Sequence, residues 1–461
     1  MPLPFDGPRA RPTLTALLIS ATLTLGACSN DDDDGASGPD MPGNTLAPDD
    51  TPDGTTENTP DDTPDDTPDN TDDPDTAGDP LGNGPDGAAL AFVSSAAFDF
   101  TAGQIERLDL GNEFASTGTT PATGSDIRVA TDGTDVYEIG RFNLDTLTRF
   151  ATDDLDDPVY QYSVNGEEST VNPYSIVFLN ENKAYVIRRN SPLLWVVDPS
   201  SDTEANFLLS TIDLGAYDGD AKPEMSDAVI VDDKLFVLME RLDDDFAPRQ
   251  NGYVAVIDTD TDTEIDTGEG QDGLFGIALQ TSNPAGLQYL EESDEIYVVG
   301  RGNIFGNEAV EADPYNGGIE TIDPDTYRND LLLDDGTTDD NDDFFVDALV
   351  ISPTRGYVLT YAGFRVTTLR TFNPMTGMLD EAPVEGLVDQ DISVLALGPQ
   401  ERLWVGINGA ADSGAGSGFR LLDPSDGSVL VERVATEFNP NGIVFIEPSG
   451  TTAQARNVTT R

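Results

Sequence analysis

Residues 439–445 read NPNGIVF, a motif that recurs along the chain but here stands apart from the segment that normally follows it. Its relatives are NPYSIVF (172–178), SDAVIV (226–231), NPAGLQY (283–289), VDALVI (346–351), DISVLAL (391–397) and a weaker SDIRVA (125–130). Each relative is followed by a short segment of β-branched and aromatic residues, which favour strands. No such segment follows residues 439–445.

The segments that follow are themselves a repeat. They are LAFVS (90–94), DVYEI (135–139), AYVI (184–187), LFVL (235–238), IYVV (296–299), GYVL (356–359) and LWVG (403–406), so the first has no NPNGIVF-like element before it. A third element comes next, as LWVVDP (194–199), VAVIDT (254–259), IETIDP (319–324), LRTFNP (369–374), FRLLDP (419–424), and weaker IERLDL (105–110) and RFNLDT (141–146). The repeat region therefore begins and ends with an incomplete unit: the first lacks its first element, and the last lacks the elements that should follow.

These two incomplete units complete each other if the chain closes into a ring. About 360 residues at a spacing near 50 agree with seven four-stranded blades, the fourth strand being the least regular. The sequence thus predicts an all-β fold, a seven-bladed β-propeller, with six or eight blades as alternatives. The pattern resembles the YVTN-type and quinoprotein-like propellers of bacterial exported proteins over residues 88–450. Because these motifs are degenerate, the resemblance implies a fold rather than an activity.

The N-terminus is predicted to be a targeting segment. Arg9 and Arg11 precede a short apolar run, and LGAC (25–28) ends in the only cysteine of the chain. LGAC resembles the bacterial lipobox, which implies cleavage after residue 27 and acylation of Cys28, with Ser29 favouring the outer membrane. An ordinary secretory signal, in which Cys28 is incidental, is the alternative. We therefore expect a lipid-anchored protein on the periplasmic side or the cell surface.

Residues 28–87 are predicted to be a disordered tether. They are rich in Asp, Pro and Thr, begin with the block Asp31–Asp34 and contain almost nothing apolar. Such a segment cannot bury enough surface to fold, and its repelling charges and prolines keep it extended. The aspartate block also resembles the signals that send some bacterial lipoproteins to the cell surface. The propeller would follow over 88–450, with a tail at 451–461.

Composition excludes several classes of function. The chain has 87 acidic and 23 basic residues, a net charge of −64, and no histidine. Nucleic acids and anionic lipid headgroups are therefore disfavoured as partners. Catalysis through Ser-His-Asp, Cys-His or His-metal groups is excluded as well. The sequence favours a binding or scaffold module for an envelope or extracellular protein or glycan. The alternative is a hydrolase or lyase that uses carboxylates or calcium.

The sequence also indicates candidate site residues. Long loops at 240–252, 300–318 and 407–418 are expected on one face, together with four arginines that follow the aromatic strands: Arg141, Arg188, Arg241 and Arg301. These arginines would hold a carboxylate or sulfate, or else form salt bridges between blades with carboxylates such as Asp126, Asp227 and Asp347.

One loop suggests calcium. Within DTDTDTEIDTGE (258–269), five carboxylates match oxygen-donor positions of the EF-hand template: Asp258, Asp260, Asp262, Asp266 and Glu269. Thr263 stands where that template has glycine, and alternating polar residues on an exposed strand explain the same pattern. The loop also resembles the calcium loops of integrin-type propellers.

Overall fold

The computed structural model describes residues 89–243, 246–304, 317–336, 344–409 and 416–447. The chain divides into two units, Met1–Pro74 and Asp75–Arg461, and every described residue belongs to the second. The predicted signal peptide, Cys28, the tether and the C-terminal tail lie outside the described residues. In the described part, no helix has both the length and the apolar character needed to cross a membrane.

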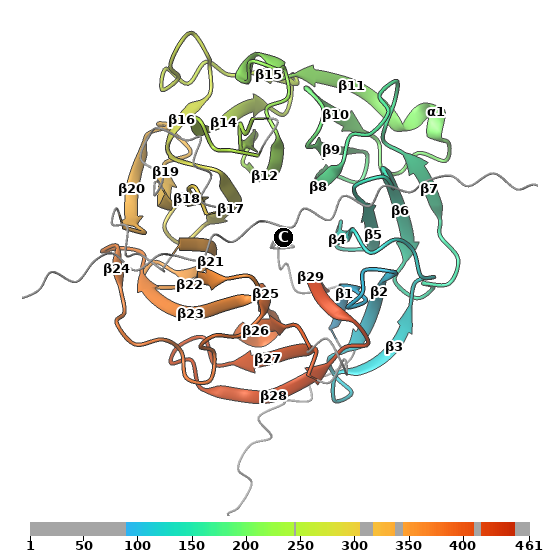
Figure 1. The fold of residues 1–461 in the computed structure, drawn as a ribbon. Helices are drawn as coiled ribbons and strands as arrows, with labels where there is room; N and C mark the ends of the chain where they lie inside the picture. The colour runs from blue at the N-terminus through green and yellow to red at the C-terminus, as the bar shows by residue number, and fades with distance from the viewer. Residues whose placement is uncertain (1–88, 244–245, 305–316, 337–343, 410–415, 448–461) are drawn as a thin grey trace, which may run out of the picture. The chain divides into compact units, whose positions relative to one another are not determined.

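Seven antiparallel sheets, called blades 1 to 7 here, are arranged around a central axis (Figure 1). Blade 1 consists of β29 (Asn439–Ile446), β1 (Leu90–Ala96), β2 (Gly103–Asp109) and β3 (Ala115–Thr119). Blade 2 consists of β4 (Ile127–Thr131), β5 (Asp135–Gly140), β6 (Thr146–Ala151) and β7 (Tyr160–Ser163). Blade 3 consists of β8 (Pro173–Asn180), β9 (Lys183–Arg188), β10 (Leu193–Val197) and β11 (Leu208–Asp213), with the helix α1 (Glu204–Phe207) before β11.

The remaining blades follow the same order. Blade 4 has five strands: β12 (Met225–Val231), β13 (Lys234–Met239), β14 (Asn251–Asp258), β15 (Thr263–Glu264) and β16 (Ile277–Ser282). Blade 5 contains β17 (Pro284–Leu290), β18 (Glu295–Arg301), β19 (Gly317–Ile322) and β20 (Asn329–Asp334). Blade 6 contains β21 (Phe344–Ser352), β22 (Arg355–Gly363), β23 (Val366–Asn373) and β24 (Met378–Leu379). Blade 7 contains β25 (Ile392–Gly398), β26 (Arg402–Ile407), β27 (Gly418–Leu422) and β28 (Val429–Ala435). Short 3₁₀ turns lie at Gly215–Tyr217 and Pro399–Glu401.

The ring closes through the NPNGIVF segment. β29 pairs antiparallel with β1, from Leu90 opposite Ile446 to Ala96 opposite Asn439. Figure 1 shows the red C-terminal strand beside the blue N-terminal one. The predicted seven blades and the predicted closure are both confirmed.

Burial explains the character of each strand position. β5, the second strand of blade 2, is buried along its whole length, because each sheet packs on both faces against its neighbours. One hydrophobic cluster joins blades 3 and 4 and includes Tyr185, Val196 and Val237. The fourth strands lie at the outer edge, where β11 has five exposed residues among six and β15 and β24 contain only two residues each. This irregularity of the fourth strand was predicted.

The recurring Asp or Asn at the end of the third strand forms a turn with its own side chain in six blades. In blade 2 the weaker copy at 141–146 ends where the third strand β6 begins, so that assignment from sequence was wrong. Asp258 Oδ1 accepts hydrogen bonds from the backbone N–H groups of Asp260 and Thr261 at 3.1 and 2.8 Å. The equivalent residue of blade 5, Asp323, accepts from Asp325 and Thr326 at 2.9 and 2.8 Å. The motif is therefore a turn signal, in which a short acidic side chain replaces a backbone acceptor.

Candidate functional site

The two faces of the ring differ. The loop face, as used here, carries the connections from second to third strands and the starts of the inner strands. The hairpin face carries the turns from first to second strands. The long segments 240–252, 300–318 and 407–418 join second to third strands, so their described residues belong to the loop face as predicted.

Four consecutive blades present a charged residue at one equivalent position of the loop face. Each of these residues donates its backbone N–H to the carbonyl that precedes the inner strand of its blade: Arg141 to Asp126 (2.9 Å), Arg189 to Asn172 (3.1 Å), Glu240 to Glu224 (3.1 Å) and Arg301 to Asn283 (3.1 Å). The acceptors Asn172, Glu224 and Asn283 have φ values of 50°, 49° and 50°. Asparagine tolerates this left-handed conformation, which explains why Asn-Pro recurs before inner strands.

Three guanidinium groups at this end of the ring lie against one tyrosine. The guanidinium carbons of Arg141, Arg128 and Arg189 lie 4.0, 4.9 and 5.4 Å from the ring centroid of Tyr174. Arg189 and Arg301 are joined through Glu240, at 2.7 and 3.4 Å. We call Arg128, Arg141, Arg189 and Arg301, with Tyr174, the arginine cluster. Stacking on an aromatic face holds a guanidinium in place without neutralising it.

The cluster is buried and incompletely hydrogen-bonded. Arg128 and Arg189 are 8% and 7% exposed, and the Nε of each has no hydrogen-bond partner in the described structure. Burial, helped by the charge of Arg141, lowers the pKa of Arg128 to about 10, so it remains a cation at neutral pH. Burial raises the pKa of Glu224 to about 8, so this carboxyl adds little negative charge beside Arg189 at neutral pH. A buried donor without a hydrogen-bond partner costs free energy.

Two of the four predicted arginines lie outside the cluster. Arg188 and Arg241 are one residue before and one residue after the equivalent position, and their side chains contact other partners. Arg188 ends β9, whereas Arg241 follows β13 with a φ of 54°. Arg188 is buried, donates to the carbonyls of Val164 and Asn165 and stacks 4.3 Å from the Trp195 ring.

Arg241 makes equivalent contacts in the next blade. It donates to the carbonyls of Tyr217 and Asn251 and stacks 4.6 Å from the ring of Tyr253. Both arginines tie the end of a second strand to the third strand of the same blade and to the connection from the preceding blade. The sequence analysis did not identify Arg128, Arg189 or Tyr174 as site residues. The adjacent pair Arg188 and Arg189 was a usable signal, because neighbouring residues at the end of a strand direct their side chains to opposite sides.

The carboxylates of the possible inter-blade bridges have separate partners. Asp126 lies 3.4 Å from Arg141 in its own blade. Asp227 accepts backbone N–H groups from Ala228 and from Leu287 of the next blade, and Asp347 accepts from Ala348. At this position of the loop face, the observed bridges between blades use Glu240 instead, which pairs with Arg189 and Arg301.

The five carboxylates of 258–269 do not converge. Asp258 caps the turn, and the hydrogen bonds from Thr261 hold its pKa below the ordinary value. Asp262 pairs with Lys183 at 2.8 Å and accepts from Tyr185 at 2.9 Å, while Asp266 caps Gly268. Among the described residues, no group of three or more Asp, Glu, Cys or His side chains could hold a metal ion. Calcium binding here stays a prediction of the sequence, and it would require the loop to give up these contacts.

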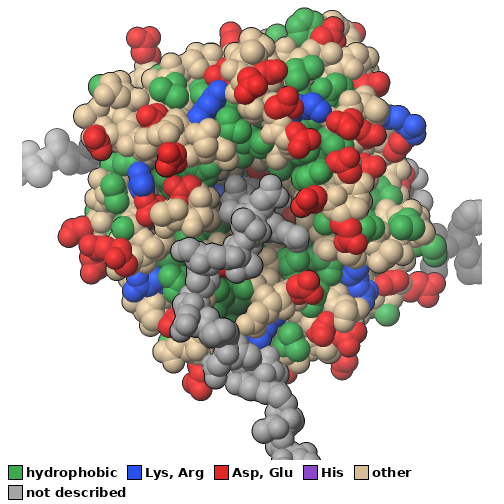
Figure 2. Space-filling model, turned by 180° about the vertical axis from the view of Figure 1, so that it is seen from behind, with side chains coloured by type: hydrophobic (Ala, Val, Ile, Leu, Met, Phe, Trp, Pro, Cys, Tyr) green, Lys and Arg blue, Asp and Glu red, His purple; other side chains and the backbone are tan. Residues whose placement is uncertain are grey.

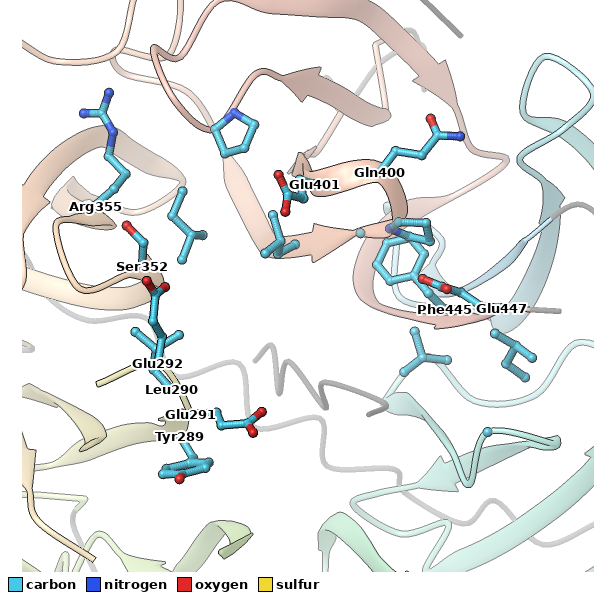
Figure 3. A pocket seen from close by; sticks show the side chains of 18 of the residues that line it. Tyr289, Leu290, Glu291, Glu292, Ser352, Arg355, Gln400, Glu401, Phe445 and Glu447 are labelled. Atoms are coloured by element: carbon cyan, nitrogen blue, oxygen red, sulfur yellow. The ribbon is translucent and has the colours of Figure 1, made fainter. Parts of the chain in front are cut away.

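The opposite end of the central channel opens on the hairpin face. A cavity of about 1230 Å³ is lined there by turns of blades 2, 5, 6 and 7 and by the end of β29. Figure 3 shows Glu291, Glu401 and Glu447 around this opening, with Arg355 to one side. A second cavity of about 550 Å³ lies against inner strands of blades 2 to 7. Figure 2 shows Asp and Glu side chains scattered over one face of the molecule, with fewer Lys and Arg between them. Anions are therefore favoured at the arginine cluster and disfavoured at the hairpin-face opening.

This arrangement defines the class of protein: a seven-bladed β-propeller closed by a strand from each end of the repeat region. No family model matches the chain, and no curated protein matches it. Among solved structures it is similar to a protein from Lactobacillus plantarum, at 13% identity over 78% of this chain and 100% of that one, with a TM-score of 0.52. It is also similar to a candidate 6-phosphogluconolactonase from Bacteroides uniformis, at 11% identity over 78% and 100% with a TM-score of 0.50.

A third similar structure is the β-propeller domain of Cps50 (Swd1) from Myceliophteria thermophila, at 12% identity over 70% and 94% with a TM-score of 0.48. At these identities the likeness concerns the fold alone.

Proposed function

We propose that the protein is a binding module whose arginine cluster holds an anionic group, a carboxylate or a sulfate, of an envelope or extracellular partner. The observation that carries this proposal is the gathering of three guanidinium groups around Tyr174, with Arg301 joined to them through Glu240, in a chain with a net charge of −64. Like charges repel at such distances, and burial raises the cost. An anionic ligand offsets both effects, because guanidinium groups bind carboxylate and sulfate oxygens through paired hydrogen bonds.

We further propose that the module is attached to the outer membrane. The support is the sequence alone: LGAC before a lone cysteine, and an acidic tether over residues 28–87. Acyl chains on Cys28 would anchor the chain, and the tether would hold the propeller away from the lipid. Incorporation of labelled palmitate into the wild type and equally into Cys28→Ser would count against this attachment.

The anion site is tested with sodium sulfate as the probe. The full chain in detergent is melted with sulfate or with sodium chloride at equal ionic strength. At sulfate concentrations about tenfold above Kd, binding stabilises the native state by about 1.4 kcal/mol, which raises Tm by about 2 °C or more. We expect this shift in the wild type and its loss in Arg141→Gln.

Arg141 is the best position for this test because its carboxylate partner, Asp126, is partly exposed and tolerates the loss of the cation. Arg328→Gln is the matched control, since Arg328 is exposed and pairs with Asp330 outside the cluster. An equal sulfate effect in the wild type and in Arg141→Gln would overturn the proposal.

A further inference from the structure

Exposed phenylalanines mark the loop face. Four of the described second-to-third-strand loops each present one large apolar ring to solvent: Phe100 in blade 1, Phe142 in blade 2, Phe246 in blade 4 and Phe364 in blade 6, at 74%, 52%, 60% and 85% exposure. Single exposed hydrophobic residues are normal on a protein surface. Here, however, an exposed phenylalanine recurs in the equivalent loop of four blades, which is not a random distribution. Each ring would gain about 1.5–3 kcal/mol if a partner buried it fully.

The other exposed hydrophobic residues lie elsewhere. Phe275, at 48% exposure, lies between β15 and β16, and Val159, Met375 and Val388 lie in connections to or from fourth strands. Leu208, Leu209, Leu331, Val429 and Leu430 belong to the fourth strands, at the outer edge of the ring. The phenylalanines are therefore a separate group, which we call the phenylalanine set: Phe100, Phe142, Phe246 and Phe364.

Two members of the phenylalanine set, Phe142 and Phe246, adjoin the arginine cluster. Phe142 directly follows Arg141, and its backbone N–H donates to Asp126 at 3.2 Å. The guanidinium of Arg189 lies 5.8 Å from the ring centroid of Phe246. In blade 6, Arg365 follows Phe364 and lies 4.5 Å from the ring of Phe98 of blade 1. Aromatic residues beside arginine are the composition that dominates binding energy in protein interfaces.

We propose that the loop face docks a protein segment that carries one carboxylate flanked by apolar side chains. This inference rests on the proposed function, because the carboxylate is the group that the arginine cluster would hold. The phenyl rings offer no hydrogen-bond donor or acceptor for sugar hydroxyls, so they fit apolar side chains better than a glycan. A strongly acidic segment would be repelled by the rest of the surface, and a second copy of a chain with a net charge of −64 would be repelled likewise.

The test uses random peptides displayed on phage and selected on the immobilised full chain. We expect the selected peptides to combine Phe, Leu, Ile or Trp with one Asp or Glu. Their Kd should weaken about tenfold or more in Phe246→Ser and in Phe364→Ser. Leu209→Ser is the matched control, because Leu209 is similarly exposed but lies on the outer edge. Both rings are exposed, so these substitutions leave the fold intact, which an unchanged Tm verifies.

A second comparison links the peptide to the cluster. Changing its single acid to the amide should weaken binding to the wild type and cause no further loss in Arg141→Gln. The phenylalanine variants should keep the sulfate-induced shift in Tm, so failure of the docking proposal is distinguishable from failure of the anion site.

Several outcomes would overturn the docking proposal: peptides that bind the phenylalanine variants as tightly as the wild type, glycan-array binding that these variants lose, or concentration-dependent dimers that they abolish.

Discussion

At the scale of single residues, a shift of one position decides what an arginine does. Arg188 and Arg189 are neighbours, yet Arg188 is buried against Trp195 while Arg189 joins the arginine cluster. The residue type and its approximate place in the repeat were predictable, so the sequence analysis identified Arg141 and Arg301 as residues of the loop face. The direction of a side chain depends on the last paired residue of the strand, which composition does not define. Arg128 was unpredictable because its contacts come from a different blade.

Glu138 should make stability depend on pH. This residue of β5 is 4% exposed, its Oε2 has no hydrogen-bond partner in the described structure, and burial raises its pKa to about 7. An unfolded Glu loses its proton near pH 4.5, so between pH 4.5 and 7 the folded state binds more protons. The free energy of unfolding therefore falls as pH rises through this window.

Replacing the carboxyl by an amide should remove this loss. Glu138→Gln is expected to raise the free energy of unfolding above pH 7 by up to about 3 kcal/mol and to leave it nearly unchanged below pH 4.5. Urea denaturation at pH 4 and pH 8 measures the difference. Glu291→Gln, on an exposed turn, is the control. An unchanged pH dependence in Glu138→Gln would show that this carboxyl is ionised in the folded state.

At the scale of elements, the repeat was readable because each strand position has its own environment. Second strands are buried on both faces, and in six blades the third strand ends at an Asp or Asn that caps its own turn. Fourth strands were the hardest to predict, since they make few contacts and shrink to two residues in β15 and β24. The calcium template matched because a capped turn and an acidic loop use the same residues as a cation site.

The closing strand should tolerate a new position in the chain. β29 and β1 are antiparallel neighbours, so a chain in which residues 437–447 precede residue 89 through a short Gly-Ser linker can form the same blade. We expect this permutant to unfold cooperatively with a Tm within a few degrees of the 75–461 unit. Deleting residues 437–447 exposes the partners of Ile443 and Val444, and should cost about 3 kcal/mol or more. Circular dichroism melting compares the three chains, and equal stability of the deletion would refute the role of β29.

At the scale of the molecule, charge and topology act together. The number of blades followed from counting repeats, but the cavity on the hairpin face did not. Its walls come from turns far apart in the sequence, around Thr131, Tyr289, Ser352 and Gln400, which carry no shared motif. The phenylalanine set could not be predicted from the sequence either. The four side chains are far apart along the chain, and only the circular arrangement of the blades places them on one face.

Salt should stabilise the whole molecule. With a net charge of −64, repulsion between surface carboxylates opposes the compact state. The screening length falls from about 30 Å at 0.01 M to about 3 Å at 1 M salt. We expect Tm to rise steadily between 10 mM and 1 M NaCl, by the same amount in Arg141→Gln as in the wild type. Sucrose at matched osmolality controls for solvent exclusion, and a flat or falling Tm in NaCl would refute the expectation.

The pairing of β29 with β1 also sets the order of folding. The chain is synthesised from its N-terminus, so β1 exists long before its inner neighbour does. Until residue 446 has emerged, blade 1 keeps an unpaired strand edge, which is a template for aggregation. The ring therefore closes at the place where it began, through a contact that spans nearly the entire domain and is expected to form late. A cell that makes this protein must therefore prevent aggregation of the nascent chain until its final strand has been synthesised.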